Sequence, residues 1–318
     1  MLYFSAADQY LTVCRSSGKS VNTIDSYSRT LKSFGDFLSS VNIHLVENIT
    51  PAVLVNWKMQ VSATASSSSL RLYVAHLKGF FDFCTDIEFV QRNPFKKKLM
   101  EVAVKESDVK DTIAHVLAAK HFRQIWTLEK PSGMHARTVE RNRAILLLFL
   151  TSGIRCSSLC RLTFSDLFMQ EKTIRIRNAK GGKNGEVLLS NLAASAIDRY
   201  LCSGYIPEGS GWSQDAPLFG FVDASGAWTP YSREQMSGIV ELSVRGFTGQ
   251  AGFRAHALRH TCASLLSANG LSDGEVSTLL MHSDGTGARV TNRYIDRSNA
   301  ALFHKADLIF QRLAGTLE

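Results

Sequence analysis

A short stretch near the C-terminus carries residue types that act together on a phosphodiester. It contains His256, Arg259 and His260 in the pattern H-x-L-R-H, followed by His282 and then Tyr294. An arginine guanidinium presents a planar fork of donors that fits a phosphate bidentately. A histidine can move a proton near neutral pH, and a tyrosine hydroxyl can attack phosphorus to give a covalent intermediate. The stretch predicts a DNA strand-transfer site, so the rest of the chain must supply a second arginine, a general acid and a way to hold DNA.

Two earlier segments supply the missing cations. Arg155 follows a turn at Gly153 and opens a helix whose apolar positions point inward, so its charge needs an anionic partner. Residues 172–190 alternate apolar and charged positions and then enter a glycine-rich turn, which predicts a β-hairpin. Lys180 and Lys183 stand at or near the tip of this hairpin, where an ammonium group can protonate a leaving oxygen.

The N-terminal residues 1–93 show helical patterns only. Apolar residues recur at helical spacing in four segments, which predicts a small bundle that buries one face. Ser20 is the expected N-cap of a helix over 21–40, and Pro51 is expected at the first position of the next helix.

The last predicted helix of this bundle follows a serine-rich run at 62–70, interpreted as a joint between two helices. Arg71, His76 and Lys78 on that helix are candidates for phosphate contacts, although each could equally occupy an ordinary solvated face. Asn93-Pro94 then ends the helix.

Residues 94–111 are predicted to be a basic linker, because three consecutive lysines follow the helix break. A positive connector suits a protein that closes around DNA, and it would also serve as a plain solubilising linker. From residue 112 to 318, helical segments flank the predicted hairpin, so this part is expected to be a mixed α+β domain ending in a helix.

Composition narrows the class of protein. The 318 residues suit one large or two ordinary domains, and an apolar share of 45% excludes wholesale disorder. A formal charge of +8 favours a polyanionic partner. Cys156 and Cys160 lie one helical turn apart without a second pair to complete a zinc site, so packed thiols are expected. No apolar run is long enough to span a membrane and no signal peptide is evident, which predicts a cytoplasmic, nucleoid-associated protein.

The ordered motifs resemble the tyrosine recombinases of the phage integrase family. Gly153-Ile154-Arg155, Lys180 in a hairpin, the H-x-L-R-H run, His282 and Tyr294 follow one another in the family's order. Each motif alone is weak, but five in order are specific.

The N-terminal bundle also resembles that family, through the pattern S-x-x-T-x-x-x-Y-x-x-x-L-x-x-F from Ser20 to Phe34 and the Asn93-Pro94 pair at its boundary. The resemblance implies a multidomain fold, with an all-α, SAM-like core-binding bundle joined to a mixed α+β catalytic domain. Because no additional arm-binding module is evident, a simple recombinase of the Xer or transposon-resolving type is expected.

The resemblance implies a role for each residue of the reaction itself. Tyr294 would attack the scissile phosphate, form a 3′-phosphotyrosyl link and free a 5′-hydroxyl. Arg155 and Arg259 would clamp the non-bridging oxygens and stabilise the charge of the transition state. Lys180, or alternatively Lys183, would protonate the departing 5′-oxygen.

The histidines complete the implied site. His256 would assist the tyrosine proton or orient the phosphate, and His282 would donate a hydrogen bond to a phosphate oxygen. His260 matches the second histidine of the motif, and its role is left open between structure and chemistry. Because guanidinium and ammonium groups supply the positive charge and the phosphotyrosine conserves bond energy, neither a metal nor ATP is expected.

Three positions depart from the family pattern. Ser158 replaces the acidic residue that often follows the first arginine by three, so another group must orient Arg155. Met281 replaces the glycine that usually precedes the later histidine, which is expected to alter the turn there. The interval from His282 to Tyr294 is longer than usual, which predicts a mobile tyrosine loop that partners must order.

The expected partners are double-stranded DNA and further copies of the chain. In the family, four protomers exchange strands on two duplexes, and a tail helix packs onto a neighbouring protomer. Packing of this tail on its own domain is the alternative, and a requirement for an accessory DNA-binding protein is left open. Two other functions also stay open: a type IB topoisomerase-like enzyme, and a catalytically inactive DNA-binding regulator.

Overall fold

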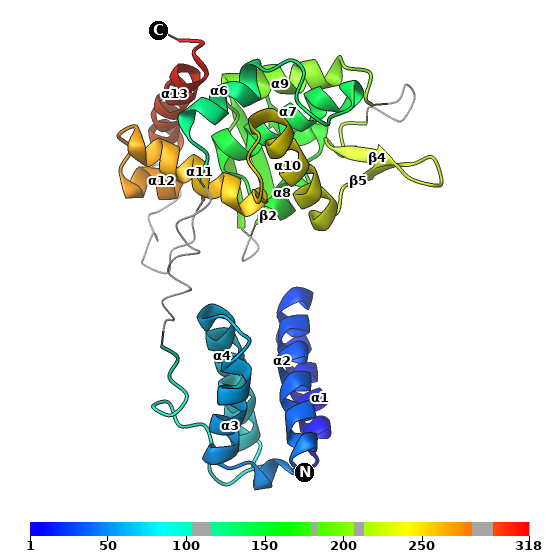
Figure 1. Cartoon of the computed structure of the whole chain (residues 1–318), viewed down its shortest axis with the longest axis vertical. Helices are drawn as coiled ribbons and strands as arrows, with labels where there is room; N and C mark the ends of the chain where they lie inside the picture. Colours follow the sequence, from blue (N-terminus) through cyan, green and yellow to red (C-terminus); the bar gives the residue numbers. More distant parts are fainter. Residues whose placement is uncertain (104–115, 180–182, 207–212, 282–294, 318) are drawn as a thin grey trace. The chain divides into compact units, whose positions relative to one another are not determined.

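The computed structural model describes residues 1–103, 116–179, 183–206, 213–281 and 295–317, and leaves aside the side chains of 178, 179, 183 and 295–299. The chain divides into two compact units, Met1–Ala114 and His115–Glu318. Unit 1 is helical, whereas unit 2 combines helices with small sheets, as the sequence predicts (Figure 1). Within the described residues, no helix has the length and apolar character required to cross a membrane.

Unit 1 contains the four expected helices. Ser20 caps α2 by accepting a hydrogen bond from the Thr23 amide at 3.2 Å, and Thr50 caps α3 directly before Pro51, so both predicted helix starts are confirmed. The aromatic side chains of Phe34, Phe80 and other residues fill the core between the helices. The bounds are α1 Tyr3–Ser16, α2 Val21–Ser40, η1 Val46–Asn48, α3 Pro51–Ser62 and α4 Ser67–Asp86.

Two expectations for unit 1 need correction. The joint expected over 62–70 is confined to residues 63–66, between the end of α3 at Ser62 and the start of α4 at Ser67. The Ser66 hydroxyl accepts from the Ser69 amide at 3.2 Å, so Ser67, Ser68 and Ser69 form the first turn of α4. His76 does not face solvent, because it is only 6% exposed and its Nδ1 lies 2.8 Å from the Thr30 hydroxyl. Arg71 remains exposed and available to a phosphate.

Helix α7 lies in the middle of unit 2, among the helices α6, α9, α10 and α11 (Figure 1). Every side chain from Ala144 to Leu150 is fully buried, which explains why its sequence is apolar on all sides. The helix ends at Gly153, whose φ of 59° is the left-handed conformation that favours glycine, as predicted. These helices span α6 Ala119–Thr127, α7 Ala136–Ser152, α9 Asn191–Leu201, α10 Arg233–Thr248 and α11 Ala255–Ala268.

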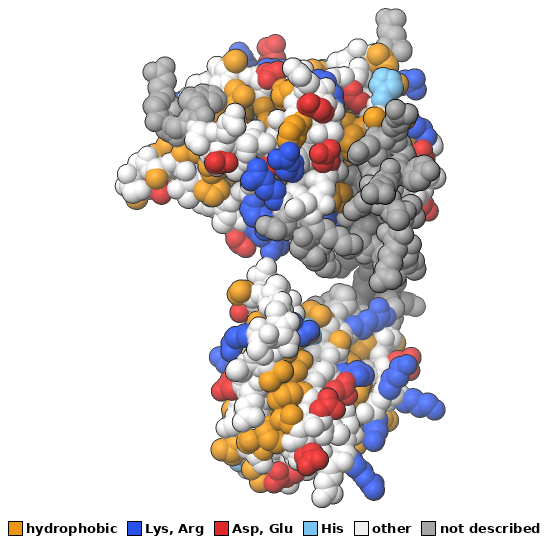
Figure 2. Space-filling model, turned by 180° about the vertical axis from the view of Figure 1, so that it is seen from behind, with side chains coloured by type: hydrophobic (Ala, Val, Ile, Leu, Met, Phe, Trp, Pro, Cys, Tyr) orange, Lys and Arg blue, Asp and Glu red, His pale blue; other side chains and the backbone are white. Residues whose placement is uncertain are grey.

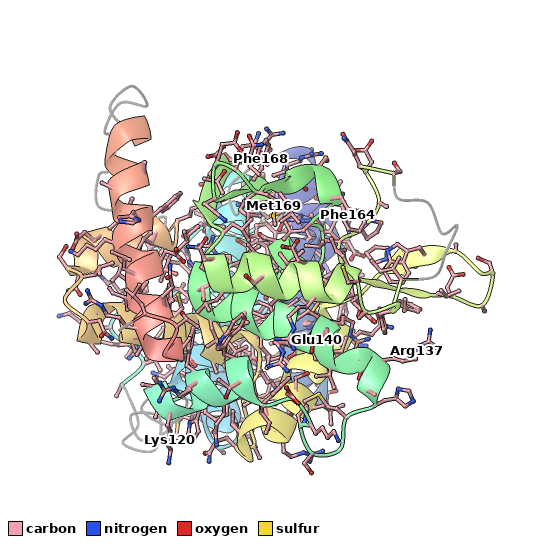
Figure 3. The ribbon with its side chains drawn as sticks, turned by 90° about the horizontal axis from the view of Figure 1, so that it is seen from above. Lys120, Arg137, Glu140, Phe164, Phe168 and Met169 are labelled. Atoms are coloured by element: carbon pink, nitrogen blue, oxygen red, sulfur yellow. The ribbon has the colours of Figure 1, made fainter. Side chains whose placement is uncertain are left out.

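A three-stranded antiparallel sheet contains the predicted hairpin. Strand β2 (Thr173–Ala179) pairs with β3 (Lys183–Leu188), which confirms the hairpin, and β1 (Leu167–Phe168) adds an edge that the sequence pattern did not reveal. A two-residue strand is too short to show an alternating pattern. Two short helices precede β1, namely α8 Cys156–Leu159 and η2 Phe164–Asp166, and Phe164, Phe168 and Met169 lie near one another there (Figure 3).

The segment before α10 has a strand structure that the sequence pattern did not reveal. It contains a second hairpin made of β4 (Gly220–Val222) and β5 (Trp228–Pro230). Strand β5 passes so close to β4 that a Cβ on Gly220 would lie 2.6 Å from the Thr229 carbonyl oxygen. The strands are short and turn residues surround them, so the turn signals dominate the sequence pattern.

The C-terminal helix α13 (Ile295–Ala314) packs on its own unit, against α6 and α9. The Phe310 ring stacks on Phe122 with centroids 5.8 Å apart, and an Asp307 oxygen accepts from the Asn191 amide at 2.8 Å. Phe303, Ile309 and Phe310 are buried and form the apolar side of this helix. Of the two placements considered for the tail, this chain by itself adopts the one on its own domain. The preceding helix, α12, spans Asp273–Leu279.

Candidate active site

Arg155 stands at the start of α8, directly after the left-handed turn that ends α7. It is the N-cap residue of α8, and its backbone carbonyl accepts hydrogen bonds from the amides of Ser158 and Leu159. Its side chain is half-buried, and its Nη2 donates to the Met281 carbonyl at 3.3 Å. Ser158 occupies the position where an acidic residue was expected, and among the described residues the backbone carbonyl of Met281 orients this guanidinium.

Arg259 lies on α11 and is only 7% exposed. Its Nη2 donates to the Leu280 carbonyl at 2.6 Å, and its Nη1 donates to the Gly153 carbonyl. The turn after α7 and the end of α12 therefore meet at the two arginines. Gly153 makes this approach possible, because a Cβ there would lie 1.9 Å from Leu280 Cδ2.

Both guanidinium groups bond to neutral carbonyls. Among the described residues, neither arginine forms an ion pair with a carboxylate. Burial, together with the adjacent charge of Arg155, lowers the pKa of Arg259 to about 10. A buried cation without an anionic partner is costly, so this pair of arginines forms a strong binding point for an anion such as a phosphate.

The two histidines of the H-x-L-R-H run lie on the same helix as Arg259. His256 and His260 are exposed, one turn apart on α11, and their Nε2 atoms lie 3.1 Å from each other. Partial burial lowers the pKa of His256, and the neighbouring His260, Arg259 and Arg155 add to this effect. His256 is therefore neutral near pH 7 and can accept a proton.

A cavity of about 490 Å³ opens beside His256. Its wall comes from the starts of α8, α10 and α11, and it carries basic and acidic side chains together. The lining residues are Cys156, Arg233, Glu234, Ser237, Gly238, Glu241, Arg254, Ala255 and His256. Among the residues that the structure describes, no group of three or more His, Cys, Asp or Glu side chains is placed to hold a metal ion.

Three of the six predicted site residues, Arg155, His256 and Arg259, come together in this way. Lys180, His282 and Tyr294 lie outside the described residues. The β2–β3 hairpin nevertheless contacts one of the residues that hold the two arginines. A Cβ on Gly185 of β3 would lie 2.3 Å from Met281 Cε, so β3 packs against the residue whose carbonyl holds Arg155.

Sequence reasoning missed the backbone groups that hold the arginines, namely the carbonyls of Gly153, Leu280 and Met281. Met281 has a φ of 49°, the left-handed conformation that a glycine would adopt more easily. Met281 therefore adopts, at a cost in strain, the backbone conformation that a glycine would adopt at this position. The glycine expected there from the family pattern was the signal in the sequence that the backbone takes this conformation.

Comparison with known proteins identifies the family of both units. Residues 115–300 match the phage integrase family, and residues 7–86 match the phage integrase N-terminal SAM-like domain. Tyrosine recombinase XerC of Bacillus pumilus is 26% identical over 271 residues, covering 84% of each chain.

Solved structures share the fold at lower sequence identity. A lambda integrase dimer bound to a COC′ core site superposes with a TM-score of 0.65 and 18% identity, covering 90% of this chain and 75% of that one. A lambda integrase tetramer bound to a Holliday junction gives a TM-score of 0.64 and 16% identity, covering 92% and 80%.

Proposed function

Since the chain belongs to the phage integrase family and is a tyrosine-type site-specific recombinase, we propose that it cuts and rejoins DNA through a 3′-phosphotyrosyl intermediate. The reaction would serve the integration, excision or resolution of a DNA element. One observation carries this proposal. Arg155 and Arg259 converge on adjacent carbonyls with no carboxylate partner among the described residues, beside a histidine whose pKa is lowered.

The two guanidinium groups bind the non-bridging oxygens of the scissile phosphate. Their hydrogen bonds to Leu280 and Met281 fix their positions before DNA arrives, so little reorganisation accompanies the reaction. Such preorganised donors favour the transition state, in which the phosphate oxygens carry additional negative charge. The charge of the pair is not cancelled by a neighbouring carboxylate in the described part of unit 2.

The remaining site residues complete the exchange of bonds. The Tyr294 oxygen attacks phosphorus, the bond from phosphorus to the 5′-oxygen breaks, and Lys180 gives that oxygen its proton. His256 accepts the tyrosine proton, and His282 donates a hydrogen bond to the phosphate. The 5′-hydroxyl of a partner strand then attacks the phosphotyrosine, which restores a phosphodiester and frees Tyr294.

DNA binding involves both units. The chain carries a net charge of +8, and Lys and Arg side chains gather in a band on unit 2 and stand out along one side of unit 1 (Figure 2). Phosphate contacts from such surfaces give affinity that falls with added salt. We infer a core-binding domain in residues 1–93, a catalytic domain in 112–318 and a basic linker in 94–111, the first part of which packs on unit 1 through the buried Met100.

The assembly that performs the reaction is a homotetramer on two DNA duplexes, with room for an accessory DNA-binding protein. A lambda integrase tetramer on a Holliday junction shares this fold and supports that arrangement. Because its substrate is the chromosome or a mobile element, the protein works in the cytoplasm at the nucleoid.

Recovery of covalent adducts tests the proposal. Wild type, Tyr294→Phe and a control, Tyr73→Phe in unit 1, are expressed with their native DNA, and denatured protein-linked DNA is sequenced at its ends. Adducts at defined sites from wild type and Tyr73→Phe, but not from Tyr294→Phe, are expected. Specific DNA binding without adducts from any of the three proteins would contradict the proposal and favour an inactive regulator. Relaxation of supercoils by a monomer on arbitrary DNA would favour a topoisomerase-like enzyme.

A further inference from the structure

The contact between His256 and His260 restricts where protons can reside in the site. The residues are four apart on α11, their Nε2 atoms are 3.1 Å apart, and their rings meet edge to face at 79°. Two imidazole nitrogens at this distance share one hydrogen, since two N–H groups would collide and two lone pairs would repel. One histidine must therefore donate from Nε2 and the other must accept.

The direction of this hydrogen bond determines what His256 offers to DNA. If His256 donates from Nε2, its Nδ1 carries a lone pair and can accept a proton. If His260 donates instead, His256 holds its own hydrogen on Nδ1 and can only donate there. A base for Tyr294 requires the first arrangement.

We propose that His260 is a positioning residue that holds His256 in the tautomer with hydrogen on Nε2 and takes up the proton released by the nucleophile. The inference rests on the proposed role of His256 as the base. When Tyr294 attacks, its hydroxyl proton moves to His256 Nδ1, and the hydrogen on His256 Nε2 moves to His260 Nε2. His260 leaves the step as an imidazolium and passes a proton to water from its exposed position.

The surroundings of the pair favour movement of the proton away from His256. Arg259 on α11 and Arg155 at the start of α8 both lower the pKa of His256, so a second positive charge at that ring is unfavourable. His260 is exposed to solvent, where a charge is better tolerated. The other titratable and charged groups around His256, which line the same cavity, are Cys156, Arg233, Glu234, Glu241 and Arg254.

A purely structural role for His260 makes a different prediction. An exposed side chain contributes little to the core, so its replacement would leave folding and the titration of His256 unchanged. Ser264, exposed one turn further along α11, provides the matched control, because it lies on the same helix without contacting His256 in the manner of His260.

Histidine-selective NMR of the full-length, DNA-free protein tests the pairing directly. In wild type and Ser264→Ala, the ring nitrogens of His256 should report hydrogen on Nε2 near pH 7. In His260→Ala, the pKa of His256 should rise, since His260 contributes to its depression, and the two tautomers should mix. An unchanged titration and tautomer in His260→Ala would overturn the inference.

Single-turnover cleavage tests the consequence for catalysis, with a nicked duplex that carries the site recovered from wild-type adducts. His260→Ala should lose about tenfold in rate, less than the roughly 10²-fold or more that a general base contributes, and its pH profile should move upward with the pKa of His256. His260→Gln, which can accept a hydrogen bond but does not titrate, should recover part of the rate.

The outcomes separate this inference from the proposed function. An equal loss in Ser264→Ala, or an unshifted pH profile in His260→Ala, would contradict the role of His260 while wild-type cleavage upholds the recombinase. Failure of wild type to form any adduct would contradict the proposed function and the relay together, and NMR would then still decide whether His260 fixes the tautomer of His256.

Discussion

Arg259 and Arg155 donate hydrogen bonds to the carbonyl oxygens of two consecutive residues, Leu280 and Met281, at 2.6 and 3.3 Å. The two arginines come from different helices, yet one short piece of backbone orients both. The backbone that follows α12 therefore fixes the distance between the two guanidinium groups. Any change that shifts this backbone should affect both arginines at once.

Replacement of Arg259 by glutamine should lower the cleavage rate strongly, with little effect on folding. Loss of one preorganised donor to a transition-state oxyanion lowers the rate by about 10² to 10³-fold. The carbonyls of Gly153 and Leu280 lose a donor, but the cost of burying an unpaired cation disappears as well, so the melting temperature should change little. Single-turnover cleavage and thermal unfolding, measured side by side, check this.

Arg312→Gln serves as the control, because Arg312 is exposed in the last turn of α13. It should cleave at the wild-type rate. Collapse of the melting temperature in Arg259→Gln would instead assign Arg259 a structural role and weaken the case for an anion site.

Gly153→Ala should impair folding and catalysis together. Alanine at a φ of 59° is strained, and its Cβ would lie 1.9 Å from Leu280 Cδ2, so the buried Leu280 side chain must shift. The Gly153 carbonyl accepts a hydrogen bond from Arg259, so strain at this residue also disturbs the guanidinium. The expected loss is about 3 kcal/mol of unfolding free energy, from left-handed strain and displaced packing. Urea unfolding and single-turnover cleavage measure the two effects.

Gly249→Ala is the matched control. Gly249 also ends a helix at positive φ, 72°, but a Cβ there meets nothing within 4 Å. This variant should lose only about 1 kcal/mol from backbone strain and keep its cleavage rate. Equal effects at both glycines would show that strain alone, and not the contact with Leu280, explains the result at Gly153.

The sequence predicts the features of this site that side-chain patterns encode. The apolar run of α7, the glycine at its end and the alternating hairpin at 172–190 all have local signals, and the structure contains each of them. The pairing of Arg155 with Arg259 is likewise expected from the order of the motifs. The groups that the two arginines contact could not be predicted in this way, because they are backbone carbonyls, which every residue has.

Long-range packing explains the remaining differences. Arg155 bonds to a residue 126 positions away, and no local pattern connects them. The position of His76 in the sequence is compatible with a phosphate contact and with burial. It is buried because α2 packs against α4, which no local pattern shows. The apolar stripe of α13 shows that the helix must be covered, but the stripe is the same whether its own unit or another protomer covers it.

Asp307→Ala should loosen α13 from its own unit. One Asp307 oxygen accepts from the Asn191 amide at 2.8 Å and the other from the Asn191 side chain at 2.5 Å, so the carboxylate fastens α13 to the N-terminus of α9. Loss of these bonds should cost about 1–3 kcal/mol, because an amide at the start of α9 loses its partner.

Hydrogen exchange followed by mass spectrometry measures the loosening, as faster exchange in α13 peptides of Asp307→Ala. Asp198→Ala, at an exposed position on α9, should leave this exchange unchanged. Equal protection of α13 in both variants would mean that the stacking of Phe310 on Phe122 suffices to hold the helix.

The stability of unit 1 should fall in mild acid because of His76. Burial lowers the pKa of His76 below its ordinary value of 6.5, and its Nδ1 lies against the Thr30 hydroxyl. Above pH 6.5, the folded and unfolded forms are both neutral at this residue, so its contribution is complete. Below that pH, the unfolded chain binds a proton that the folded unit resists, so stability decreases by up to about 1.4 kcal/mol per pH unit until the folded pKa is reached.

Hydrogen exchange in α2 and α4 peptides between pH 7.5 and 5.5, corrected for intrinsic exchange rates, reports this loss for unit 1 alone. His76→Gln keeps a polar group beside Thr30 that does not titrate, so its protection should depend less on pH than that of wild type. His44→Gln, at an exposed position before η1, should retain the wild-type dependence. If wild type and His76→Gln lose protection in parallel, another titrating group must cause the acid sensitivity, and His76 would have no part in it.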